Sequence, residues 1–239
     1  MRKEAPTYAK AAEGLVSRLF DPRLLTPVLI FTAIGFALLA LFAAFGQGAL
    51  AIVDEPIERW MIEHRTPWLD TVMTGVTFLG TRYFVGAALL ALAVWALRAG
   101  RCRATVLVLV VAFTLNPLIE FIAKQLIDRP RPDLARVGAG TGPAFPSGHV
   151  LVAMGFYSLL PVFVSESPHR YRAQLAAGLL GAALILMIGF SRMYRDVHWF
   201  TDVVGGILMG AVVVLGTYRA LRGHRLDPAR CRGHPSVGS

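Results

Sequence analysis

Long uncharged apolar runs alternate with short polar stretches along most of the chain. The longest run extends from Leu24 to Val53, and it exceeds the roughly 20 residues that a helix needs to cross a bilayer. Five further runs approach spanning length once their flanks are included: Tyr83–Leu97, Ala104–Ile119, Val150–Ser165, Ala173–Ser191 and Val203–Tyr218. The pattern therefore predicts an all-α polytopic membrane protein with six transmembrane helices in a bundle.

The polar segment between the first two spans differs from the other loops. From Asp54 to Gly80 it contains several acidic residues and two tryptophans, with a Thr66-Pro67 pair in its middle. Such a composition favours a helix that lies in the membrane interface, and Thr66-Pro67 predicts a break before a re-entering helix. We therefore expect an interfacial helix after the first span.

Lysine and arginine residues indicate how the bundle is oriented. They gather before the first span, between spans two and three, between spans four and five, and after span six. The positive-inside rule places these four segments in the cytoplasm, so both termini are expected there. The loops at 48–81, 124–148 and 192–200, together with the interfacial helix, are then extracytoplasmic.

Composition supports a membrane protein. Hydrophobic residues make up 55% of the chain and charged residues only 16%, against about 25% charged residues in soluble domains. The net charge is +9, but the basic residues lie at the chain ends and between apolar blocks. Topology accounts for this placement, so we expect no nucleic-acid partner.

These observations divide the chain into three parts. A cytoplasmic N-terminal segment (1–23) precedes a six-span membrane domain (24–221), and a cytoplasmic tail (222–239) rich in Arg, Pro and Gly is expected to be disordered. The Ala-, Gly- and Arg-rich composition and the short loops favour the plasma (inner) membrane of a bacterium, with the lipid bilayer as an obligate partner.

The first polar cluster on the extracytoplasmic side is cationic. Lys124 precedes Arg131-Pro132, although ordinary topology would place such cations on the cytoplasmic side. They suggest an anionic partner such as phosphate, while snorkelling to lipid headgroups is the simpler alternative. Glu120 lies four residues before Lys124, and we expect it to support the cluster by pairing with this lysine or another of its cations.

The second cluster is Pro146-Ser147-Gly148-His149, directly before the fourth span. Ser147 is placed to cap that helix, Gly148 allows close backbone approach, and the free amides of the first turn can hold an anionic oxygen. A capped helix with a surface histidine is the alternative interpretation. No Gly-x-Ser-x-Gly motif surrounds Ser147, which argues against a serine hydrolase.

The third cluster runs from Ser191-Arg192 to His198 and Asp202 at the start of the sixth span. His198 and Asp202 are four residues apart, so on a helix they would share one face, and the carboxylate could orient the imidazole. Asp202 could instead be an ordinary carboxylate in the first turn of a helix. Arg195 and Asp196 between them are expected to form a solvated pair.

Together the three clusters place cations, a helix N-terminus and two histidines on one face of the bundle. Three cations and free amides could hold three phosphoryl oxygens, one histidine could attack phosphorus, and the other could protonate the leaving oxygen. The predicted chemistry is phosphoryl transfer.

Lys-x6-Arg-Pro at 124–132, Pro-Ser-Gly-His at 146–149 and Ser-Arg-x5-His-x3-Asp at 191–202 resemble the three-part signature of the type 2 phosphatidic acid phosphatase family. With the six-span layout, the resemblance covers roughly residues 20–220. Soluble vanadium haloperoxidases resemble the same signature, but they lack a membrane bundle. A lipid phosphate phosphatase is therefore the activity that the resemblance implies.

The resemblance also implies the role of each site residue. His198 would be the nucleophile that becomes phosphohistidine, with Asp202 supporting it, and His149 would be the general acid. The residues expected to bind the phosphate are Lys124, Arg131, Ser147, Gly148 and Arg192. No cofactor and no metal is expected, since the active face offers no carboxylate cluster suited to Mg²⁺.

Two alternatives from other classes fit part of the pattern. A phosphotransferase would pass the phosphate from the same histidine to an acceptor hydroxyl. A lipid or anion transporter can also bury polar residues in a bundle, although we see no internal repeat. The motifs do not choose among phosphatidic acid, phosphatidylglycerol phosphate and polyprenyl pyrophosphate, and they indicate no oligomeric state.

Overall fold

The computed structural model describes residues 22–98, 103–132, 142–161 and 171–222, and this part of the chain is helical and contains no strand. Its helices are α2 (Pro22–Phe45), α3 (Gln47–Glu63), α4 (Pro67–Phe78), α5 (Arg82–Arg98), α6 (Arg103–Leu126), α7 (Gly148–Tyr157), α9 (Tyr171–Tyr194) and α10 (Phe200–Arg222). The expected N-terminal segment and tail lie almost wholly outside the described residues. The predicted all-α class is confirmed.

Fewer helices qualify as complete membrane spans than the six predicted. Within the described residues, three are long and apolar enough to cross a bilayer, namely Arg23–Phe45, Arg172–Tyr194 and Phe200–Ala220. Helices α4 and α5, which meet at an angle of 47°, would form a fourth if they make one bent span. The predicted span that begins at Val150 starts as the ten-residue apolar helix α7, and the described segment ends at residue 161.

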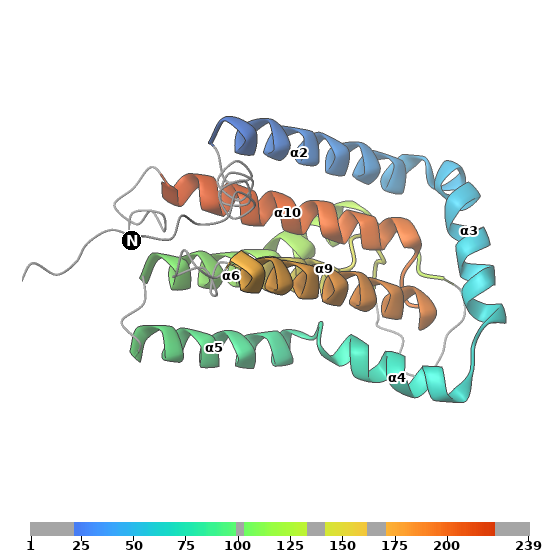
Figure 1. Ribbon diagram of the computed structural model, residues 1–239. Coiled ribbons are helices and arrows are strands. Elements are labelled where there is room, and N and C mark those ends of the chain that lie inside the picture. Colours follow the sequence, from blue (N-terminus) through green and yellow to red (C-terminus); the bar gives the residue numbers. More distant parts are fainter. Residues whose placement is uncertain (1–21, 99–102, 133–141, 162–170, 223–239) are drawn as a thin grey trace, which may run out of the picture.

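The longest apolar run does not form one continuous helix. Helix α2 ends at Phe45 and α3 begins at Gln47, and a side chain on the intervening Gly46 would collide with Phe42 of the preceding turn. From there α3 crosses the ends of α10 and α9 before α4 turns back along the bundle (Figure 1). Helix α4 starts with Pro67 at its first turn, so a helix does break at the Thr66-Pro67 pair.

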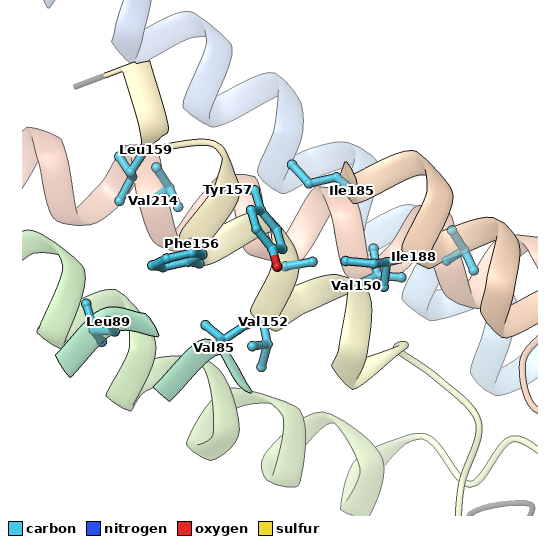
Figure 2. Packing of buried hydrophobic residues seen from close by; sticks show 12 residues of the cluster. Val85, Leu89, Val150, Val152, Phe156, Tyr157, Leu159, Ile185, Ile188 and Val214 are labelled. Atoms are coloured by element: carbon cyan, nitrogen blue, oxygen red, sulfur yellow. The ribbon is translucent and has the colours of Figure 1, made fainter. Parts of the chain in front are cut away.

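Helix α7 lies at the centre of the bundle. It packs against α6, α9, α10 and α5, and an apolar helix that is covered on all sides is typical of a buried element. Figure 2 shows its Phe156 and Tyr157 among side chains of α5, α9 and α10, including Ile188. The Tyr157 hydroxyl donates a hydrogen bond of 2.8 Å to the carbonyl of Leu79, so this buried polar group is satisfied.

Two small residues allow α10 to approach α7 closely. A side-chain carbon at Gly206 would lie 2.7 Å from the carbonyl oxygen of Ser147, and one at Gly210 would lie 2.6 Å from the Cβ of Met154. Both distances are shorter than a van der Waals contact. The Gly-x-x-x-Gly pair therefore packs inside the bundle and holds the start of α7 beside α10.

The outward surface of the bundle is apolar. Large hydrophobic side chains project from its outer helices, with Phe31 and Phe45 of α2 and Tyr83 of α5 each more than four-fifths exposed. Soluble monomers rarely expose so many large apolar groups. A surface of this kind fits contact with lipid chains, as the long apolar helices also do.

Candidate active site

His198 lies in the short connection between α9 and α10. Asp202, in the first turn of α10, accepts a 2.9 Å hydrogen bond from the backbone N–H of Trp199 with its Oδ2 atom. The same oxygen lies 3.5 Å from Nδ1 of His198, and both side chains are buried. The expected pairing of these residues is present, but His198 precedes the helix and does not share its face. The carboxylate caps the helix start and reaches back to the imidazole.

The connection that carries His198 makes a sharp turn at Asp196, whose φ of 61° is in the left-handed region. Asp196 is 2% exposed and lies 3.6 Å from the guanidinium of Arg65, while Arg195 donates a 2.6 Å bond to the hydroxyl of Thr74. The expected solvated Arg195–Asp196 pair is therefore wrong. Each residue contacts the α3–α4 segment instead, because that segment covers this turn.

Three cations from different elements act on His198: Arg192 at the end of α9, Arg131 after α6, and Lys124 in the last turn of α6. Burial and these cations hold the pKa of His198 well below its usual value. The imidazole is therefore neutral at pH 7. A neutral ring is the form in which histidine can act as a nucleophile.

Arg131 connects two of the motifs through backbone carbonyls. Its Nη1 atom donates a 2.7 Å hydrogen bond to the carbonyl of Val197, next to His198, and its Nε atom donates one of 2.8 Å to Gly142. Arg192 donates to the hydroxyl of Thr77 at 2.9 Å and keeps its buried Nε without a partner. Arg131 therefore orients the loop that carries His198, and Arg192 retains a donor for a ligand.

Lys124 is held by a carboxylate on its own helix. Glu120 lies 2.8 Å from the Lys124 ammonium and 2.5 Å from the guanidinium of Arg82 in α5. The Glu120 carboxylate also packs against Gly148, where any added side-chain carbon would overlap it. Glu120 thus lies between the lysine and the start of α7.

The start of α7 faces the same cations. Ser147 occupies the N-cap position, but its side chain makes no capping hydrogen bond, and its buried Oγ has no partner. Ser147 therefore has the expected N-cap position, but its hydroxyl does not cap the helix. Its backbone N–H donates instead to the carbonyl of Asp202 at 3.0 Å, which joins α7 to α10. His149 follows one position into the helix, within electrostatic range of Arg192 and His198.

Two buried residues of the site were not among the sequence-based candidates. Arg129 is 4% exposed, and it lies 2.6 Å from Asp202 and 2.6 Å from Asp54 of α3. Arg129 precedes Pro130 as Arg131 precedes Pro132, and Asp54 is the first charge after the long apolar run. These positions are visible in the sequence, but their pairing is not, because 75 residues separate the partners.

Among the described residues, no group of three or more histidine, cysteine or acidic side chains is arranged to hold a metal ion. Two of the residues that the motifs predict as phosphate ligands instead have buried donors without a partner, namely Ser147 Oγ and Arg192 Nε. Buried donors without partners are unfavourable unless a ligand satisfies them. Donors in this setting suit an oxyanion.

Comparison with known proteins gives one consistent family. Residues 105–225 match the family model of the PAP2 superfamily. The chain is 31% identical over 180 residues to phosphatidylglycerophosphatase B of Bacillus subtilis (strain 168), and the matched region covers 73% of this chain and 86% of that protein. All three motifs lie within residues 105–225, the region that matches the family model.

Solved structures agree on the fold. The crystal structure of a transmembrane PAP2-type phosphatidylglycerolphosphate phosphatase from Bacillus subtilis superposes with a TM-score of 0.68 and 26% identity, covering 79% of this chain and 93% of that one. Aquifex aeolicus LpxE superposes with a TM-score of 0.55 at 22% identity over 69% of this chain and 94% of its own, which concerns the fold alone. The chain belongs to the PAP2 superfamily, and it is a membrane enzyme of the lipid phosphate phosphatase class that its three-part motif predicts.

Proposed function

We propose that the chain hydrolyses the phosphomonoester or pyrophosphate headgroup of a membrane lipid through a phosphohistidine on His198, without a metal. The observation that carries this proposal is the surroundings of His198. Its buried ring has Asp202 at Nδ1, which leaves Nε2 for attack, and the unpartnered donors Ser147 Oγ and Arg192 Nε lie in the same site. This arrangement suits a nucleophile beside an oxyanion pocket.

The first chemical step transfers the phosphoryl group to the enzyme. Nε2 of His198 forms a bond to phosphorus while the bond from phosphorus to the lipid oxygen breaks. His149 donates a proton to the departing oxygen, which carries the electron pair of the broken bond. Asp202 supports the positive charge that develops on the His198 ring.

The second step restores the enzyme. Water attacks phosphorus and loses a proton to His149, the phosphorus–nitrogen bond breaks, and its electron pair returns to His198. During both steps the side chains of Lys124, Arg131 and Arg192 supply positive charge to the phosphoryl oxygens. Ser147 and the N–H of Gly148 supply neutral donors from the start of α7.

The proposed substrates are phosphatidylglycerol phosphate, phosphatidic acid and polyprenyl pyrophosphate. The relative that shares 31% identity is a phosphatidylglycerophosphatase, so we place phosphatidylglycerol phosphate first. The lipid enters from the bilayer with its chains against the apolar outer surface, and only its headgroup reaches the cationic pocket.

We also propose the topology that the basic segments indicate. Residues 24–221 form a six-span phosphatase domain, both termini are cytoplasmic, and the site with α3 at the interface faces the extracytoplasmic side of the plasma (inner) membrane. A single cysteine at Glu63 should then react with an impermeant maleimide in intact spheroplasts, and one at Arg98 should react only after the membrane is permeabilised. Labelling of both from the same side would overturn this topology.

The chemical proposal is tested with detergent-purified protein in the presence of EDTA. Wild type should release inorganic phosphate from at least one of the three lipids and become labelled on histidine by a ³²P-labelled headgroup. His198→Ala should lose both signals, while replacement of the exposed His64 by alanine should keep them. Activity that requires a divalent metal, or that survives in His198→Ala, would contradict the proposal. Transfer to added glycerol in place of release would identify a phosphotransferase.

A further inference from the structure

A buried charge network lies behind the His198–Asp202 pair. The Arg129 guanidinium contacts two carboxylates: Nη1 donates to Oδ1 of Asp202 and Nη2 donates to Oδ2 of Asp54, both at 2.6 Å. Thr201 completes the contact, since its hydroxyl accepts from Arg129 at 2.7 Å and donates to Asp54 at 2.7 Å. None of these side chains is more than 7% exposed.

The network joins three segments that are distant in sequence. Asp54 comes from the middle of α3, Arg129 from the segment after α6, and Asp202 from the first turn of α10. The Asp54 carboxylate also accepts the backbone N–H of Thr201 at 2.9 Å. Asp54 therefore secures the turn from which Asp202 reaches His198.

The charges of the network do not cancel. Two carboxylates share one guanidinium, so with both carboxylates ionised the group formed by Asp54, Arg129 and Asp202 carries a net charge of −1. With Asp202 and Arg129 alone the net charge would be zero, and the carboxylate beside His198 would be neutralised by its neighbour. Asp54 also pairs with the guanidinium, so the group keeps a net negative charge on the side of His198 that faces α10.

That charge matters because the proposed step makes His198 cationic. When Nε2 bonds to phosphorus and Nδ1 keeps its proton, the ring gains a positive charge in a buried site. Arg192, Arg131 and Lys124 oppose this charge from the phosphate side. Among the charged groups, only the net anionic group behind the ring favours it, and a hydrogen bond with the backbone of Ala144 adds a smaller, uncharged contribution in the same direction.

We propose that Asp54 and Arg129 are positioning residues of the catalytic site, which act through Asp202 to orient His198 and to set the net charge behind it. The proposal rests on the proposed function, because it takes His198 as the nucleophile. It extends the site from the three sequence motifs to α3, which lies outside all of them and across the end of the bundle (Figure 1).

The test uses the acid limb of kcat/KM against pH, measured from pH 4 to 9 in detergent. Asp54→Asn removes negative charge behind His198, so the limb should move to lower pH by about 0.5 unit or more. Arg129→Gln removes positive charge, so the limb should move to higher pH. The double variant Asp54→Asn/Arg129→Gln restores the net charge, and its limb should return toward that of wild type.

Other charged groups face His198 from neighbouring elements and are not substituted in these variants. They are Arg192 of α9, Lys124 of α6, Arg131 of the following segment, His149 of α7 and Asp202 of α10. Asp196, which lies two residues before His198 and contacts Arg65, is also unchanged. Differences between the limbs therefore report the charge of the network.

Turnover separates positioning from substrate binding. Asp54→Asn should lower kcat about 10-fold to 100-fold, the size typical for outer partners of a functional histidine, while KM stays within about twofold. Arg129→Lys keeps the positive charge, but a lysine ammonium cannot bond Asp54, Thr201 and Asp202 together as the planar guanidinium does. We therefore expect kcat to fall without a shift of the acid limb. Glu55→Gln removes the same charge from the adjacent, exposed position of α3 and should change neither quantity.

Thermal unfolding in detergent identifies any variant that fails to fold. If Arg129→Gln does not fold, Asp54→Asn and the double variant still give the comparison. Single variants whose limbs move in the same direction, or a double variant whose limb does not return toward that of wild type, would overturn the proposal. So would an unshifted limb and unchanged kcat in folded Asp54→Asn. Loss of the proposed function itself would show separately, as activity that persists in His198→Ala.

Discussion

The centre of the bundle and the end crossed by α3 are both buried, but they are built differently. Around α7 the buried side chains are almost all apolar, as Figure 2 shows for Phe156, Ile188 and their neighbours. At the α3 end, Asp54, Arg129 and Asp202 are each less than 5% exposed. Apolar packing tolerates small changes of shape, whereas a buried charge requires its partner.

This difference indicates where each region contributes. The apolar centre fixes the distance between α7, α9 and α10, and so it sets how near the start of α7 lies to His198. The charged end fixes the direction and the electrostatics of His198. Stability should therefore depend on both regions, and catalysis should depend mainly on the charged end.

The strongest test of this comparison is Arg129→Met. The substitution leaves the carboxylates of Asp54 and Asp202 buried without their shared cation, and we expect it to lower the free energy of unfolding by about 3–5 kcal/mol. Denaturant unfolding in detergent measures this. If the variant unfolds at the same denaturant midpoint as wild type, the buried carboxylates of Asp54 and Asp202 do not need Arg129 for stability.

Arg192→Met tests catalysis at the same end. Its Nε is a buried donor without a partner, and we expect its loss to lower kcat/KM for phosphate release about 10²-fold to 10³-fold, as for the removal of one oxyanion donor. Arg59 is an exposed arginine of α3, so Arg59→Met is the matched control and should stay near the wild-type value. Similar losses of kcat/KM in both variants would mean that removal of any positive charge lowers activity, and that Arg192 does not act as a specifically positioned donor.

Ile188→Val tests the apolar centre. Ile188 is fully buried in the cluster around α7, and removal of one methylene group should lower the free energy of unfolding by about 0.5–1.5 kcal/mol. The kcat of the folded variant should stay within about twofold of wild type. A large loss of kcat at unchanged stability would contradict the division between the two regions.

The smallest expected effect concerns Glu58 of α3. Burial and the neighbouring Asp196 raise the pKa of Glu58 to about 7. Because this pKa is above the unfolded value, the protonated carboxyl contributes stability at low pH that is lost as pH rises through about 7. Glu58→Gln should therefore raise the unfolding midpoint at pH 8.5 relative to wild type and have less effect at pH 5. Glu63→Gln, at an exposed position of the same helix, should show no such dependence on pH.

Much of the fold could be predicted from the sequence because long apolar runs favour helices in a membrane. The runs that begin at Tyr83, Ala173 and Val203 correspond to α5, α9 and α10 within a few residues. The run from Leu24 to Val53 contains the expected span as α2, but its last residues belong to α3, and hydropathy alone does not separate the two helices because both segments are apolar.

The amino-acid sequence is enough to identify the family and the three motifs, because motif residues keep short spacings that remain visible in one dimension, and its long apolar runs indicate the all-α class. The folded structure adds that Ser147 keeps its hydroxyl unbonded, that Arg131 bonds the loop beside His198, and that Asp54 and Arg129 lie behind Asp202. These contacts join helices that are far apart along the chain. Their partners are selected by burial, because a charge removed from water must find an opposite charge wherever the fold places one.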